Sequence, residues 1–143
     1  MNSMKTKMNS KELENFIPHR KPMLLVNNVE LGEDGMSYGS YKVTGDEWFL
    51  QGHFPNMPIV PGVIQCEMLA QSSCMLLLEN IKGRTPLFGG LDKIRFKKQV
   101  RPGDTVELVC KLKKARDPFY FVSGKGLVEG QVCVSGEFFF VLI

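Results

Sequence analysis

One long apolar segment dominates the hydrophobic pattern of this chain. After Gly62 and as far as Asn80 there is no proline and no further glycine, and apolar side chains would cover nearly every face of a helix. A helix that is apolar all round is typical of a buried helix. At ~1.5 Å per residue it would be about 27 Å long. The pattern therefore predicts one long central helix that the rest of the chain encloses.

Alternating apolar and polar residues predict strands on both sides of this helix. A short N-terminal helix should come first, and the expected strands cover residues 23–31, 36–43, 91–100, 105–112, 119–128 and 131–142. Within residues 91–100, the alternation places Lys93, Arg95 and Lys97 outward and Phe96 inward. One long helix among mostly antiparallel strands is an α+β layout.

Length and composition fit one globular domain. A chain of 143 residues can bury roughly two-thirds of the surface that its unfolded form exposes. Residues 1–9 carry positive charge with no apolar segment behind it, so we expect a disordered tail, not a secretory signal, followed by a single domain over residues 10–143. No apolar segment approaches the ~20 residues of a membrane span. The four cysteines show no C-x-x-C spacing, which favours free thiols in a reducing cytoplasm.

Net charge matters less here than its distribution. A formal charge of +3 is too small to indicate a nucleic-acid partner. Basic residues nevertheless cluster at Lys93, Arg95, Lys97, Lys98 and Arg101. This cluster is either a solvated strand face or a docking surface for an acidic partner.

Glu67 is the polar residue that most needs an explanation. It lies among apolar residues of the predicted helix, and a glutamate is almost never fully buried unless it is paired. A carboxyl group in such surroundings is a good proton donor near neutral pH. The alternative is a structural carboxylate that backbone amides or an arginine satisfy.

His53 supplies the complementary proton chemistry. It is one of two histidines and lies in a proline-rich loop just before the helix, and an imidazole can take or give a proton at physiological pH. The alternative is a capping or hydrogen-bonding histidine. His19 is set aside, because its short basic connector has no carboxylate nearby in the sequence.

The start of the helix offers a third component. The N–H groups of Gly62 and Val63 would stand at its positive end, where they could stabilise an oxyanion or merely bind water or a side chain. Two distant histidines and the lack of a Cys/His cluster do not make a metal site. We expect no metal and no cofactor.

Four collinear segments carry a resemblance to a known family. They are residues 17–26, 51–71, 90–96 and 100–104, and the second contains H-F-P-x-x-P-x-x-P-G-V-x-x-x-E from His53 to Glu67. With these segments the chain resembles the FabZ-type 3-hydroxyacyl-acyl carrier protein dehydratases of type II fatty acid synthesis. A relative that also isomerises the double bond carries an aspartate at the position of Glu67, so the glutamate argues against that subtype.

The resemblance implies a hotdog fold, in which a curved antiparallel sheet wraps around the central helix. It also implies a cytoplasmic homodimer, usually assembled as a trimer of dimers, in which the histidine of one subunit faces the glutamate of the other. The implied substrate is a (3R)-3-hydroxyacyl thioester on acyl carrier protein, which loses water to give the trans-2-enoyl thioester without a cofactor.

Roles follow from the same resemblance. His53 would be the general base and Glu67 the acid, with Gly62, Val63 and Gln71 binding the substrate and its oxyanion. Two further sets of residues complete the expectation: Phe54, Met68 and Phe96 for the acyl tunnel, and Lys93, Arg95, Lys97 and Lys98 for docking the acidic carrier protein. A hotdog acyl thioesterase and a non-catalytic acyl-binding subunit remain the alternatives.

Overall fold

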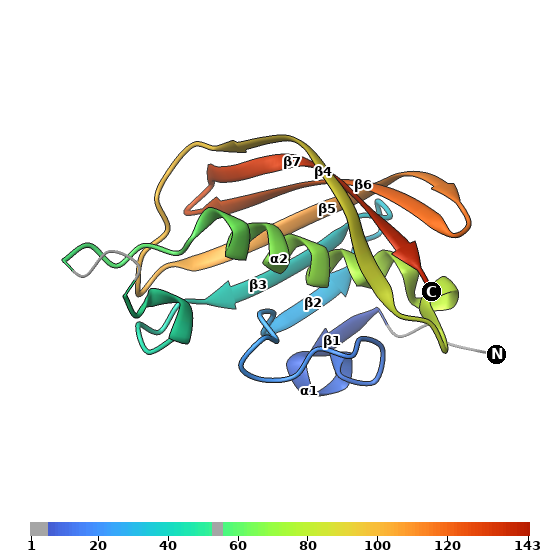
Figure 1. Ribbon diagram of the computed structural model, residues 1–143, viewed down its shortest axis with the longest axis horizontal. Helices are drawn as coiled ribbons and strands as arrows, with labels where there is room; N and C mark the ends of the chain where they lie inside the picture. The colour runs from blue at the N-terminus through green and yellow to red at the C-terminus, as the bar shows by residue number, and fades with distance from the viewer. Residues whose placement is uncertain (1–5, 53–55) are drawn as a thin grey trace.

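The computed structural model describes residues 6–52 and 56–143. In these residues a seven-stranded antiparallel sheet curves around one long helical segment (Figure 1). The strand order is β1-β2-β3-β5-β6-β7-β4, so β1 and β4 form the two edges. This is the α+β hotdog arrangement that the sequence predicted.

The strands account for most of the chain. Their bounds are β1 Lys7–Asn9, β2 Asn28–Leu31, β3 Ser37–Lys42, β4 Pro86–Phe96, β5 Thr105–Arg116, β6 Phe119–Val128 and β7 Gln131–Leu142. A short helix α1 (Ser10–Leu13) and a 3₁₀ turn η1 (Trp48–Leu50) lie before the central helix. The predictions for residues 119–128 and 131–142 are confirmed at both ends.

The central helix begins where it was predicted and changes character before its end. The α-helix α2 covers Gly62–Ser73, a 3₁₀ turn η2 covers Cys74–Leu77, and a short helix α3 covers Leu78–Ile81. At the transition the Ser73 hydroxyl and the Cys74 thiol both donate to the carbonyl of Ala70. Side chains that compete for backbone carbonyls disturb the regular helix ladder, and this accounts for the tighter turn. No helix in the described ranges is long and apolar enough to cross a membrane.

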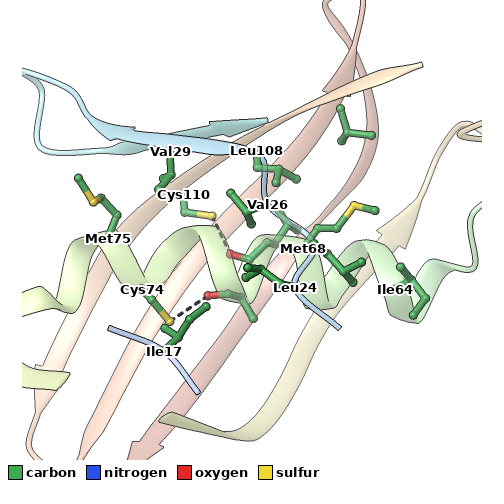
Figure 2. Packing of buried hydrophobic residues seen from close by; sticks show 14 of the residues in the cluster. Ile17, Leu24, Val26, Val29, Ile64, Met68, Cys74, Met75, Leu108 and Cys110 are labelled. Atoms are coloured by element: carbon green, nitrogen blue, oxygen red, sulfur yellow. Dashed lines mark hydrogen bonds between the residues drawn. The ribbon is translucent and has the colours of Figure 1, made fainter. Parts of the chain in front are cut away.

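The core lies between α2 and the inner face of the sheet (Figure 2). Met68 and Leu69 of α2 and Leu108 and Cys110 of β5 are almost completely removed from solvent. The Cys110 thiol donates to the Leu69 carbonyl, which ties the helix to the strand beneath it. Burying such side chains stabilises a fold by roughly 1.5–3 kcal/mol each.

The helix approaches β3 most closely at a glycine. A Cβ atom at Gly39 would lie 2.2 Å from Oγ and 3.1 Å from Cβ of Ser72, so a larger residue does not fit without movement. The Ser72 hydroxyl is buried and has no hydrogen-bond partner among the described residues. This contact sets how deeply α2 can lie in the sheet.

Regular structure begins closer to the N-terminus than we expected. The predicted tail covered residues 1–9, but Lys7–Asn9 pair with β2 as β1, and Met8 is buried in the core. The helix that follows is capped by Asn9 through a capping box with Glu12. An apolar residue between polar neighbours was enough to add an edge strand.

Strand β4 departs from the predicted alternation. Its pairing with β7 shifts register between Phe88 and Gly90 and again between Asp92 and Arg95, and Lys93 has a positive φ of 53°. Each shift changes which face the following residues occupy. Phe96 is consequently 55% exposed, so the prediction that it points into the core is wrong.

We predict that Gly39→Ala destabilises the protein by about 1–3 kcal/mol, because the added methyl group would overlap the Ser72 hydroxyl. Ser72→Ala alone should be close to neutral, since it removes a buried hydroxyl without a partner. The double variant should recover part of the loss. Urea unfolding of the four proteins measures this coupling, and strictly additive effects would contradict the proposed contact.

Candidate active site

Glu67 lies on the second turn of α2 with its side chain 19% exposed. Its Oε2 atom is 3.1 Å from Nε2 of His19 and accepts a hydrogen bond of 2.9 Å from the Gln71 amide. Both contacts fall on the same carboxylate oxygen. Glu67 is thus paired, as a glutamate in apolar surroundings must be.

The Gln71 amide is held in one orientation by the backbone of the preceding connector. Its Oε1 accepts a 2.7 Å hydrogen bond from the N–H of Leu25, and its Nε2 donates to the carbonyl of Met23 as well as to Glu67. The side chain is only 1% exposed. The hydrogen bonds of the Gln71 side chain thus go to Leu25, Met23 and Glu67 of the same chain. Their geometry indicates that Gln71 orients Glu67.

His19 is the site residue that sequence reasoning missed. The chain turns at Arg20, whose carbonyl accepts from the N–H groups of Met23 and Leu24 and whose guanidinium bonds back to Ile17 and His19 carbonyls. This turn brings the His19 ring against Glu67, although the two are distant in sequence. The only signal available beforehand was the place of His19 in the first of the four resemblance segments.

A cavity of about 180 Å³ lies beside this carboxyl group. The start of β4 forms its other wall, and its lining includes His19, Glu67, Gln71, Cys74, Leu87 and Phe88. The Phe88 ring stacks on Phe140 with their centroids 5.8 Å apart. Burial raises the pKa of the Cys74 thiol, with the nearby Glu67 as a second cause, so this thiol stays protonated.

A second cavity, of about 540 Å³, lies at the start of α2. Its lining includes Gly62, Val63, Phe96, Lys97 and Lys98. A Cβ atom at Gly62 would lie 2.6 Å from the Phe96 ring, so the glycine lets the aromatic side chain pack against the helix terminus. Val63 is 70% exposed at this place.

The helix terminus offers donors to this second cavity. The N-cap residue is Pro61, whose side chain makes no cap hydrogen bond, and its carbonyl accepts from the N–H groups of Ile64 and Gln65. The N–H groups of Gly62 and Val63 precede these at the positive end of the helix dipole. The arrangement suits an anionic oxygen.

Not every predicted site residue can be placed. His53 and Phe54 lie outside the described residues. Met68 is fully buried in the core, whereas Phe96 lines the cavity at the start of α2. Within one chain, the described residues do not bring Met68 and Phe96 to a common cavity.

The basic cluster is divided between two regions. Lys97 and Lys98 line the cavity beside Gly62, while Lys93 lies near Glu137, with Nζ 3.7 Å from the carboxylate, in a groove lined also by Lys111. The register shift between Asp92 and Arg95 separates the two groups. Within the described part of this cluster, Lys97 and Lys98 are the members that line the cavity at the start of the helix.

Glu47 fixes the turn that leads toward the loop before α2. Its carboxylate accepts from the N–H groups of Thr44 and Gly45 and from the Tyr41 hydroxyl. Burial raises the pKa of Glu47, but these hydrogen bonds outweigh burial and leave the pKa below its usual value. Burial, and then the bond to Glu47, raise the pKa of Tyr41.

Comparison with known proteins gives a family. A model described as a FabA-like domain matches residues 17–137, which include His19, His53 and Glu67. The chain belongs to the FabA-like family. Among its curated relatives, a 3-hydroxyacyl-[acyl-carrier-protein] dehydratase FabZ from Clostridium perfringens is 44% identical over 137 residues, covering 94% of this chain and 99% of the relative. The FabZ of Staphylococcus epidermidis is 42% identical over 142 residues, covering 97% and 98%.

Solved structures agree on the fold of this FabA-like chain. The dehydratase heterocomplex ApeI:P from Xenorhabdus doucetiae has a TM-score of 0.78 at 18% identity, covering 99% of this chain and 93% of that one. The PaaI protein of E. coli has a TM-score of 0.62 at 11% identity, covering 79% and 80%. At these identities the likeness concerns the fold alone.

The Glu47 turn predicts a pH dependence. Because the folded-state pKa of Glu47 is lowered from 4.5, its contribution to stability is present above that value and is lost as the pH falls through the folded pKa. Glu47→Gln should therefore be less stable than the parent at pH about 7, and the gap should shrink below pH about 4. Urea unfolding across this range measures it. Asp46→Asn, an exposed neighbour, is the control, and an equal pH-dependent loss there would contradict the assignment.

Proposed function

We propose that this protein dehydrates (3R)-3-hydroxyacyl-acyl carrier protein to the trans-2-enoyl thioester in type II fatty acid synthesis. The observation that carries the proposal is the 44% identity, over 94% of this chain, to a dehydratase that the chain covers almost completely. The geometry supports it, because a paired carboxyl group and the N-terminal end of a helix each line a cavity.

The proposed chemistry divides the work between three groups. His53 acts as the general base that removes the α-proton beside the thioester. The N–H groups of Gly62 and Val63 hold the oxygen on which negative charge develops. Glu67 of the partner subunit acts as the acid that helps protonate the departing hydroxyl. No cofactor takes part in this scheme.

A dimer is part of the proposal. The Glu67 cavity and the Gly62 cavity share no lining residue within the described chain, so one chain does not place the carboxyl group and the helix-terminus amides in a common cavity. Apolar side chains remain exposed along the edge strand β4, namely Leu87, Phe88, Leu91 and Phe96. An exposed apolar patch of this kind favours an interface. We propose a homodimer, further assembled as a trimer of dimers in the cytoplasm.

The acyl chain would lie against the aromatic side of the second cavity. Phe96 and Phe54 would line the tunnel entrance, and Met68, on the buried side of α2, would limit its depth from the core side. Lys97 and Lys98 would receive the acidic carrier protein, with Lys93 and Arg95 on β4 just before them.

The first test is hydration of a crotonyl thioester, the reverse of the proposed reaction. The unmodified protein should form the 3-hydroxy product, and His53→Ala and Glu67→Gln should each lower kcat by about 10²–10⁴-fold, as expected for loss of a general acid or base. Thioester hydrolysis without hydration would instead support the thioesterase alternative. No turnover of either kind would overturn the proposed function.

The second test concerns carrier docking. Reversing both Lys97 and Lys98 to Glu should raise KM for carrier-bound substrate by roughly tenfold, or about 1.4 kcal/mol, and leave KM for a short thioester mimic nearly unchanged. The matched control reverses Lys111 and Lys125, which line the groove on the sheet. Equal effects on both substrates, or on both pairs, would argue against docking at this place.

A further inference from the structure

The contacts of the two His19 ring nitrogens constrain how His19 pairs with Glu67. His19 Nε2 lies 3.1 Å from Glu67 Oε2, and the side chains are 23% and 19% exposed. The other ring nitrogen of His19, Nδ1, is buried and has no hydrogen-bond partner among the described residues. The site thus offers one partnered nitrogen and one unpartnered nitrogen, which constrains where the ring proton sits.

Three protonation states can be compared. A doubly protonated His19 would bury an N–H at Nδ1 without an acceptor. A neutral ring protonated on Nδ1, whose Nε2 accepts a hydrogen bond from a protonated Glu67, would do the same. A neutral ring with its proton on Nε2 leaves only a lone pair unpartnered at Nδ1. Orphaned buried N–H groups are rarer than under-satisfied acceptors, so this last state fits the site best.

Gln71 points to the same charge state for Glu67. The N–H of Leu25 occupies the Oε1 atom of Gln71, so the amide nitrogen must face Glu67. Two N–H donors, from His19 and Gln71, then converge on Oε2 of Glu67. An oxygen that accepts two hydrogen bonds carries no proton, and two converging N–H donors favour the ionised carboxylate.

We propose that His19 is a positioning residue, neutral and protonated on Nε2, which together with Gln71 holds Glu67 as a carboxylate by Oε2 and leaves Oε1 for the substrate. The assignment of a reaction step rests on the proposed dehydratase function. The hydrogen-bonded pair itself does not.

This geometry specifies what Glu67 does first in the dehydration. A carboxylate has no proton to donate, so Oε1 would first accept a hydrogen bond from the substrate's 3-hydroxyl group, whose proton stays on its own oxygen. His53 takes the α-proton as the α C–H and C3–O bonds break, and this proton passes through Glu67 to the departing hydroxyl group. The water that leaves consists of the hydroxyl group and the α-proton, and Glu67 is a carboxylate before and after the reaction.

Nitrogen NMR tests the pair without any assay of activity. The chain has two histidines, so ¹⁵N-histidine labelling of the full-length protein gives two ring systems, and His53→Ala identifies the one from His19. At neutral pH the His19 ring should be neutral with its proton on Nε2. A doubly protonated ring, or a neutral ring protonated on Nδ1, would overturn the proposal even if the protein proves to be a dehydratase.

Kinetics of substituted proteins test the positioning role. The amide nitrogen of His19→Gln can reach the place of Nε2, so this variant should retain kcat within about threefold, whereas His19→Leu and the shorter His19→Asn should lose on the order of 10² in kcat with KM nearly unchanged. Lys21→Ala, an exposed neighbour, is the control. Equal kcat in all variants, or equal losses in Gln and Asn, would overturn the positioning role. Failure of the unmodified protein to turn over would count against the dehydratase function alone, because the NMR result stands independently.

Discussion

The fold depends on one constraint, the seclusion of a helix with no polar face. Because α2 is buried on nearly every side after Val63, the sheet has to curve around it and the connector before β2 has to close over it. Leu24, Leu25 and Val26 of that connector are buried, yet the N–H of Leu25 bonds to Gln71 and not to a neighbouring strand. The connector that covers the helix therefore also positions Gln71 in the candidate site.

The same constraint explains why Glu67 is so well supported. A carboxyl group on an enclosed helix is largely shielded from bulk water. An unpaired charge there would cost several kcal/mol of folding free energy. His19, whose Nε2 lies 3.1 Å from Oε2, and Gln71, which donates a hydrogen bond to the same oxygen, offset this cost. His19 and Gln71, which stabilise the Glu67 carboxylate, also fix its orientation. A reacting group requires such a fixed orientation.

Sequence patterns predicted the parts of this structure that depend on local periodicity. Strands β6 and β7 were placed at both ends, and the start of α2 followed from Gly62 after a proline. The shift of register in β4 was not predictable, because a bulge depends on the partner strand and on a positive φ at Lys93. Phe96 was therefore assigned to the wrong side.

The candidate site shows the same division. Glu67 stood out because a charged residue interrupted an apolar helix, which is a local signal. His19 did not, because its contact with Glu67 arises from the turn at Arg20 and the path of the connector, neither of which leaves a periodic trace. Long-range contacts between a loop and a helix are determined by tertiary packing. The local hydrophobic pattern of the sequence does not predict them.

The buried cysteines have a consequence for how the protein meets oxidants. Each of the four is a free thiol inside the fold, and burial raises the pKa of Cys110 to about 12. Oxidation and alkylation require an accessible thiolate, and a sealed, protonated sulfur supplies neither. Oxidation of these cysteines therefore requires the protein to unfold at least locally. Its rate depends on how often the sheet and the helix separate.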